Sequence, residues 1–133
     1  MKRISIAVII GLIAFSQSSL AQLTDSKWQG NFYVPGELEC FLHFKKDSVD
    51  LVILETGGVI EGMKYTIAGD TLSLVKLFGG SPCGDEPGVY KWKIEGEILR
   101  LTLLSDPCGP RASAGLDSGL KKMPDPSPMK KED

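Results

Sequence analysis

Histidine is almost absent from this sequence, and its scarcity narrows the chemistry that the chain can perform. His43 is the only histidine among 133 residues, and the alternating pattern around it places it on an outward strand face with Phe41 and Lys45. A Ser-His-Asp or Cys-His arrangement needs a histidine beside a nucleophile and an orienting carboxylate, which nothing in the sequence indicates. We therefore expect a surface histidine and no enzymatic activity. One arrangement stays open, a pair of carboxylates converging from different strands as in glycosidases.

Motifs for metal ions, nucleotides and other cofactors are also missing. Cys40 and His43 have the C-x-x-H spacing of some metal sites, but residues three apart on a strand point to opposite faces. Gly79-Gly80 lacks the lysine of a P-loop and the spacing of a dinucleotide-binding turn. The adjacent acids Asp85 and Glu86 fall in an expected loop, where solvated charge is the usual state. We expect no metal and no cofactor.

Only one long apolar run is present, and it is too short to cross a membrane. Lys2 and Arg3 are followed by an uncharged, mostly apolar run over 4–15 and by Ser19-Leu20-Ala21, the pattern of a signal peptide cut after Ala21. Crossing about 30 Å of hydrocarbon takes about 20 residues. We therefore predict a cleaved leader over 1–21 and a soluble chain, periplasmic or secreted.

Basic residues are too few and too scattered for a nucleic-acid partner. Loss of Lys2 and Arg3 with the leader leaves 13 of the 15 basic residues against 17 acidic ones, a net charge of −4. An acidic chain without a basic stripe does not attract phosphate backbones or anionic lipid surfaces. We expect no nucleic-acid binding and no membrane span.

Helical periodicity is nearly absent, whereas alternation with period two runs through 28–104 and is punctuated by Gly, Pro, Asp and Lys. This pattern predicts an antiparallel β domain of about seven strands in sequence order, with two longer loops at 55–62 and 78–87. The segment 111–123 fits either a short helix or a last irregular strand. The Pro-rich, charged segment 124–133 is predicted to be a disordered tail.

Three predicted hairpins decide which side chains face inward. The first covers 40–54, and the second covers 63–74 with a turn at Gly69-Asp70 that pairs Ile67 with Leu72. The third has a turn at Glu95-Gly96, and its apolar residues also share one face. The six large aromatic side chains expected to face inward are Trp28, Phe32, Phe44, Tyr65, Tyr90 and Trp92.

The third hairpin also leads to a prediction for the three cysteines. Its expected register pairs Trp92 with Leu99, residues whose numbers sum to 191, and Cys83 and Cys108 share that sum. Because export permits disulfides, we predict a Cys83–Cys108 bridge. Cys40 is predicted to be a buried free thiol, which behaves as a small apolar residue.

A sheet of seven or more strands with one apolar face must close on itself or stack on a second sheet. Sequential hairpins fit a closed barrel better than a Greek-key sandwich. We therefore predict an all-β domain over 22–123, a small antiparallel up-and-down barrel of seven or eight strands.

The order of these signals is recognisable. Trp-x-Gly-x-aromatic at 28–32 is followed by Tyr-x-Ile-x-Gly-Asp-x-Leu-x-Leu at 65–74, Gly-x-Tyr-x-Trp at 88–92 and Asp-Pro-Cys-Gly-Pro-Arg at 106–111. In this order they resemble the lipocalin-like, calycin-type β-barrel domains that bacteria export. The opening has Trp before Gly, which differs from the Gly-x-Trp order of true lipocalins and points to the looser lipocalin-like group.

This resemblance implies one specific contact. In such domains an early Trp and a late Arg often pack together at the closed end of the barrel, which here implies Trp28 and Arg111. A guanidinium stacked on an indole ring gains about 0.5–2 kcal/mol. The alternative is that Arg111 pairs only with Asp106.

Two functions fit a barrel with large inward side chains. Tyr65, Tyr90, Trp92 and Phe44 form an apolar pocket with hydroxyl anchors if the domain binds a small apolar or amphipathic ligand. Alternatively these side chains fill the interior, and the domain is a protein-interaction or inhibitor module with a protein partner and a rigid 78–87 loop. A solvent-open cavity of about 300 Å³ or more favours the first function, and a packed interior favours the second.

Overall fold

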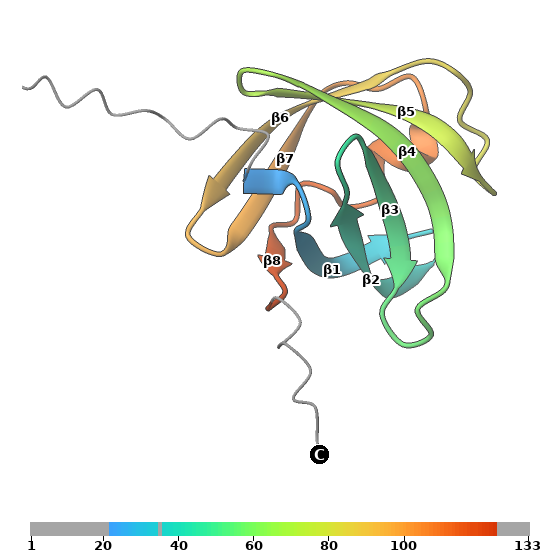
Figure 1. The fold of residues 1–133 in the computed structure, drawn as a ribbon. Helices are drawn as coiled ribbons and strands as arrows, with labels where there is room; N and C mark the ends of the chain where they lie inside the picture. The colour runs from blue at the N-terminus through green and yellow to red at the C-terminus, as the bar shows by residue number, and fades with distance from the viewer. Residues whose placement is uncertain (1–21, 35, 125–133) are drawn as a thin grey trace, which may run out of the picture.

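The chain forms a closed antiparallel β-barrel in the computed structural model, which describes residues 22–34 and 36–124 (Figure 1). The predicted leader (1–21) and nearly all of the predicted tail (125–133) lie outside these residues. No helix within the described ranges is both long and apolar enough to cross a membrane. The elements are β1 (Lys27–Tyr33), β2 (Glu37–Phe44), β3 (Ser48–Ile53), β4 (Val59–Ala68), β5 (Thr71–Gly79), β6 (Gly88–Glu95), β7 (Ile98–Ser105), α2 (Gly109–Ala112) and β8 (Leu120–Lys122).

The strands follow one another around the barrel in sequence order, as sequential hairpins predict. Each strand is hydrogen-bonded to the next, and β1 pairs with both β2 and β8. The predicted all-β, up-and-down barrel is therefore confirmed, with eight strands. The segment 111–123, for which a helix and a strand were both open, contains the end of α2 and all of β8.

Alternation with period two places the core inside the barrel. In β6, Tyr90 and Trp92 are buried, whereas Lys91 and Lys93 are exposed. All six aromatic side chains predicted to face inward are buried, together with Leu residues of β2, β3, β5, β7 and β8. Removal of this apolar surface from water supplies most of the drive to close the barrel.

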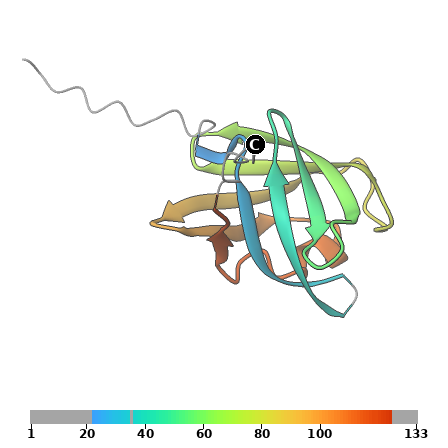
Figure 2. The same ribbon diagram turned by 60° about the horizontal axis from the view of Figure 1, so that its bottom comes forward.

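The two ends of the barrel differ in how they are built. At the turn end, three hairpins reverse within two or three residues, at 45–47, 69–70 and 96–97. At the other end, the loop end, lie the shorter connections that follow β1 and β3, the connection 80–87 between β5 and β6, and the connection 106–119, which contains α2. In Figures 1 and 2 the α2 turn and the tip of the β6–β7 hairpin lie at opposite ends of the barrel.

The first two hairpins have the predicted registers. Leu42 lies opposite Leu51 in the β2–β3 pair, and Ile67 lies opposite Leu72 in the β4–β5 pair. The predicted loop 55–62 is shorter than expected, because β4 already begins at Val59 and a register irregularity after Leu51 lets it pair with β3.

The predicted register of the third hairpin is wrong by two residues. Trp92 lies opposite Leu101 rather than Leu99, and the central residues of the turn are Gly96 and Glu97. Gly96 has φ of +59° and occupies the first central position, where type II′ turns take glycine. A shift of two residues keeps every side chain on the same face, so the inward set is unchanged.

The Cys83–Cys108 disulfide is present, with Cα atoms 5.3 Å apart, and Cys40 is a buried free thiol. The bridge is confirmed although the register that suggested it is wrong. Both cysteines lie beyond the paired strands. Cys83 belongs to the 80–87 connection and Cys108 is the residue before α2, so the bridge joins the two long connections of the loop end.

Loss of the disulfide is expected to destabilise the domain. The bridge spans 25 residues, and loop-closure entropy for this span corresponds to about 3–4 kcal/mol of unfolding free energy. The double variant Cys83→Ser, Cys108→Ser, measured by urea unfolding, should lose about this amount, and reduced wild-type protein should match it. Cys40→Ala, which leaves the bridge intact, is the control. Equal stability of the double variant and the wild type would contradict the prediction.

Candidate functional site

The four side chains predicted to form a ligand pocket lie elsewhere in the core. The Tyr65 hydroxyl donates to the Lys45 carbonyl oxygen at 2.5 Å, and its ring meets Phe44 edge-on, with centroids 5.1 Å apart. The Trp92 indole N–H donates to the Gly69 carbonyl oxygen at 3.0 Å. Tyr65 and Trp92 are thus hydrogen-bonded to the turns at the turn end, and Phe44 packs against Tyr65. These three side chains fill the barrel interior beside the turns.

Tyr90, the fourth predicted pocket residue, belongs to a buried polar cluster at the loop end. Its hydroxyl donates to Asp106 Oδ2. Arg111 donates to the same carboxylate with Nε, at 2.7 Å from Oδ2, and with Nη2, at 2.9 Å from Oδ1. Nη2 also donates to the Glu86 carbonyl oxygen at 3.0 Å, and the Cys108 backbone N–H donates to Oδ1 at 2.9 Å. The Arg111 and Asp106 side chains are 3% and 0% exposed.

Glycine at position 88 makes room for this cluster. A Cβ atom on Gly88 would lie 2.8 Å from Arg111 Nε and still closer to Asp106 Oδ2, nearer than real Cβ atoms approach other atoms. The first residue of β6 must therefore lack a side chain if the ion pair is to sit against the strand.

The cluster holds its members in defined protonation states. Burial alone would raise the pKa of Asp106, but hydrogen bonds from Arg111, Tyr90 and the Cys108 N–H outweigh it and hold the pKa below its usual value. Burial would lower the pKa of Arg111, but its bonds to Asp106 reverse this and raise it. Burial, and then the hydrogen bond to Asp106, raises the pKa of Tyr90. At neutral pH the cluster is thus an ion pair with a protonated tyrosine donor.

The predicted contact between Trp28 and Arg111 is not formed. The Trp28 indole N–H donates to Ser26 Oγ at 2.7 Å, and Trp28 lines a hollow at the turn end together with Ile94 and Gly96. Arg111 lies at the loop end on Asp106. Among the residues that the structure describes, the cation–π pair is Lys27 over Phe41 instead. Arg111 therefore takes the alternative role, as the partner of Asp106.

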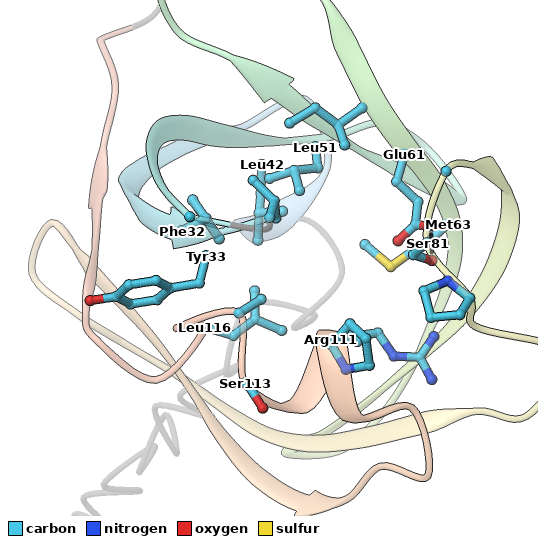
Figure 3. Close-up of a pocket in the computed structure, with 17 residues that line it drawn as sticks. Phe32, Tyr33, Leu42, Leu51, Glu61, Met63, Ser81, Arg111, Ser113 and Leu116 are labelled. Atoms are coloured by element: carbon cyan, nitrogen blue, oxygen red, sulfur yellow. Dashed lines mark hydrogen bonds between the residues drawn. The ribbon is translucent and has the colours of Figure 1, made fainter.

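A cavity of about 650 Å³ lies at the loop end (Figure 3). Its deep wall consists of buried apolar side chains from β1 to β4, and its rim includes exposed residues, so the cavity is open to solvent. The α2 turn and the segment after it form the opposite wall, held to β1 by the Tyr33 N–H to Ala114 O hydrogen bond at 3.1 Å. The lining residues are Phe32, Tyr33, Val34, Gly36, Leu42, Leu51, Ile60, Glu61, Met63, Gly80, Ser81, Pro82, Pro110, Arg111, Ser113, Ala114 and Leu116.

Charged groups gather on one side of this cavity. Figure 3 shows Glu61, Ser81 and the Arg111 guanidinium on the side of Met63, away from Tyr33. Glu61 Oε1 accepts a hydrogen bond from Ser81 Oγ and lies 3.8 Å from Lys76 Nζ. The Glu61 side chain is 9% exposed. The cavity is therefore apolar over most of its wall, with two buried charged groups concentrated at one place.

The thiol and imidazole that suggested a metal site lie in different environments. Burial raises the pKa of the Cys40 thiol, and burial, with Lys27 and Lys45 nearby, lowers the pKa of His43. Within residues 22–34 and 36–124, no three His, Cys, Asp or Glu side chains are grouped so that they could hold a metal ion.

The fold and the cavity define a class of protein, a closed eight-stranded antiparallel barrel with a solvent-open apolar cavity at its loop end. Comparisons with protein-family models, with curated proteins and with solved structures gave no match. The function of the chain is therefore inferred from its own geometry.

Removal of the Asp106 charge is expected to destabilise the domain and to change its response to acid. Asp106→Asn leaves the buried guanidinium without its counter-charge, which costs about 3–5 kcal/mol, measured by urea unfolding at neutral pH. Because the folded-state pKa of Asp106 is below the unfolded value, the wild type keeps this stabilisation above about pH 4 and loses it as pH falls through the folded pKa. The difference between the two proteins should therefore shrink at acid pH.

Asp70→Asn is the matched control, because Asp70 is exposed and lies 3.8 Å from the exposed Lys91. This variant should differ little from the wild type at any pH. A stability difference between Asp106→Asn and the wild type that stays constant down to pH 2 would contradict the assignment of the ion pair.

Proposed function

We propose that this chain is an exported, non-enzymatic domain that binds a small apolar or amphipathic molecule in the loop-end cavity. The observation that carries the proposal is the cavity itself. Its volume of about 650 Å³ lies within the range of about 300–1,000 Å³ typical of small-molecule sites. Its wall has the composition of such sites, mostly apolar with a few polar groups at one place.

Preorganisation supports the same proposal. The disulfide joins the two long connections of the loop end, and the ion pair fixes Arg111 and the connection around Glu86 to β6. A ligand that enters a preformed cavity orders few additional side chains, so more of the apolar burial contributes to affinity. Burial of apolar ligand surface contributes about 25 cal/mol per Å².

Filling the cavity should abolish binding without loss of the fold. Ala114 lines the cavity, and Ala114→Phe places an aromatic ring in it. Displacement of an environment-sensitive apolar fluorophore measures occupancy, and we expect the variant to lose at least about tenfold in affinity, since it removes most of the volume for the ligand.

Ala112→Phe is the matched control. It makes the same change two residues away, at a position in α2 that does not line the cavity, and it should bind the fluorophore as the wild type does. Equal affinity of wild type and Ala114→Phe would show that the fluorophore sits elsewhere, and the proposal would fail.

Export is proposed from the leader pattern, and the disulfide supports it. The lipocalin-like, calycin-type grouping is proposed from the motif order. Fractionation of the native cells should find the chain outside the cytoplasm, beginning at Gln22, with Cys83 and Cys108 oxidised and Cys40 free by non-reducing peptide mapping. Deletion of 2–21 should keep the chain in the cytoplasm with both cysteines reduced. Recovery of the full-length wild-type chain from the cytoplasm would contradict export.

A protein-interaction module is the second candidate. Four large apolar side chains are more than two-fifths exposed near the loop-end termini of β5 and β7, namely Leu77, Phe78, Leu103 and Leu104. Native mass spectrometry of the protein purified from its own cells separates the two functions. A co-purifying small molecule supports the cavity, and a co-purifying protein supports the exposed apolar residues.

A further inference from the structure

One carboxylate oxygen in the cavity wall has no hydrogen-bond partner. Glu61 Oε1 accepts a hydrogen bond from Ser81 Oγ, whereas Oε2 has no partner among the residues that the structure describes. The Glu61 side chain lines the cavity and is 9% exposed, so more than nine-tenths of it is buried. A carboxylate has about four acceptor sites. Glu61 therefore has spare acceptor capacity for a ligand that brings a donor.

The unpartnered oxygen can be reached from the cavity. Figure 3 shows the Glu61 side chain pointing from β4 into the cavity, toward Ser81 and Met63. Within the described ranges, Arg111 Nη1 is the one side-chain nitrogen or oxygen atom that is both unpartnered and sealed from solvent. Glu61 Oε2 is unpartnered but not sealed. Water can therefore solvate it in the absence of a ligand, and the head group of a ligand that replaces this water must supply a donor in its place.

Two cationic side chains lie near Glu61, and both are engaged elsewhere. Arg111 donates two hydrogen bonds to Asp106, which neutralises its charge. Lys76 Nζ donates to the Ser81 carbonyl oxygen and lies 3.8 Å from Glu61 Oε1, too far for a hydrogen bond to the carboxylate. Together the two acids and the two bases have no net charge. The sign of charge that the cavity prefers is therefore decided by the residues around its mouth.

The exposed charges at the mouth are acidic. The four connections of the loop end contain five acidic residues and one basic residue, Arg111. Because Asp106 neutralises Arg111, four exposed carboxylates remain, and none of them forms an ion pair with a described residue. They belong to Glu55, Asp85, Glu86 and Asp117. A cleft with low-dielectric walls and charges of one sign raises the local concentration of ligands of the opposite sign. The mouth therefore favours a cationic ligand over an anionic one.

We propose that the cavity selects a cationic amphipathic ligand, whose primary ammonium donates a hydrogen bond to Glu61 Oε2 while its apolar chain lies along Phe32, Leu42 and Leu51. An ammonium group has three donors. One of them meets Oε2, and the others keep contact with water because the cavity is open to solvent. The inference rests on the proposed function, since it names the class of molecule that the same cavity takes.

Three probes with one alkyl chain length test the head group. Decylammonium is a cation, decanol is a neutral donor and decanoate is an anion. Calorimetry with the wild-type exported chain at neutral pH, below the critical micelle concentration of each probe, should show decylammonium binding at least about tenfold more tightly than decanol. Decanoate should bind most weakly. The advantage of decylammonium should shrink at high salt, because salt screens the charges at the mouth.

A charge variant tests the acceptor. Glu61→Gln removes the negative charge and keeps an oxygen atom for Ser81 Oγ, so decylammonium should lose about tenfold in affinity while decanol changes little. Glu95→Gln is the matched control, because it changes the net charge equally from an exposed position that does not line the cavity. It should alter neither affinity. Urea unfolding checks that both variants are folded.

A second pair of variants tests the mouth without touching the core. The double variant Glu55→Gln, Asp85→Asn removes two exposed charges at the loop end, and decylammonium should bind about threefold more weakly at low salt. The double variant Asp70→Asn, Glu95→Gln removes two exposed charges at the turn end, and it should bind decylammonium as the wild type does.

The outcomes separate this inference from the proposed function. Decanol or decanoate binding as tightly as decylammonium to the wild type overturns the cationic head group and leaves the cavity as a binding site. An unchanged decylammonium affinity in folded Glu61→Gln overturns Glu61 as the acceptor. If that variant does not fold, the mouth variants decide, and equal affinities of the two double variants overturn the charge preference. If none of the probes binds, or if Ala114→Phe binds them as the wild type does, the proposed function fails and the inference fails with it.

Discussion

The loop end of this barrel depends on one buried ion pair. Arg111 and Asp106 are joined by two hydrogen bonds, and their side chains are almost fully removed from water. A buried pair is tolerated only when its remaining donors and acceptors are satisfied, because the loss of hydration is otherwise not offset. Here Tyr90, the Glu86 carbonyl and the Cys108 N–H supply the further bonds. The pair therefore ties β6, the 80–87 connection and α2 to one another, and only Nη1 is left over.

The disulfide and the ion pair act at the same place by different physical means. The Cys83–Cys108 bridge restricts the unfolded chain, whereas the ion pair specifies how the two connections pack in the folded one. Such reinforcement is needed because two long connections, 80–87 and 106–119, lie at this end. At the turn end, hydrogen bonds from Tyr65 and Trp92 to turn carbonyls seal the barrel. The asymmetry leaves the large apolar cavity at the loop end, whereas aromatic side chains occupy the interior beside the turns.

The filled and hollow interiors that the sequence left as alternatives therefore occur in one molecule. Of the four aromatic side chains predicted to line a pocket, Phe44, Tyr65 and Trp92 lie beside the tight turns, and Tyr90 belongs to the ion-pair cluster at the loop end. The cavity is lined instead by smaller side chains of β1 to β4, such as Leu42 and Leu51, and by the segment after α2. Their sequence pattern is that of ordinary core residues, so no local signal marks them as a pocket. The sequence offers the Asp106–Arg111 pair as an alternative, but the family resemblance favours Trp28 as the partner of Arg111, and that contact is not formed.

The sequence by itself determined which side chains of each strand face inward. The continuous apolar face that they form requires the sheet to close into a barrel. A period of two depends only on each residue's neighbours, and it survives an error of two residues in the pairing of Trp92. Only the tertiary structure decided the register of that hairpin, the burial of Arg111 and the position of the cavity. These depend on where the connection 106–119 lies across the end of the barrel, and that position results from contacts with Glu86, Tyr33 and Cys83, far away along the chain. Local alternation carries no information about such distant contacts, because loop placement is decided by packing, charge and covalent closure together.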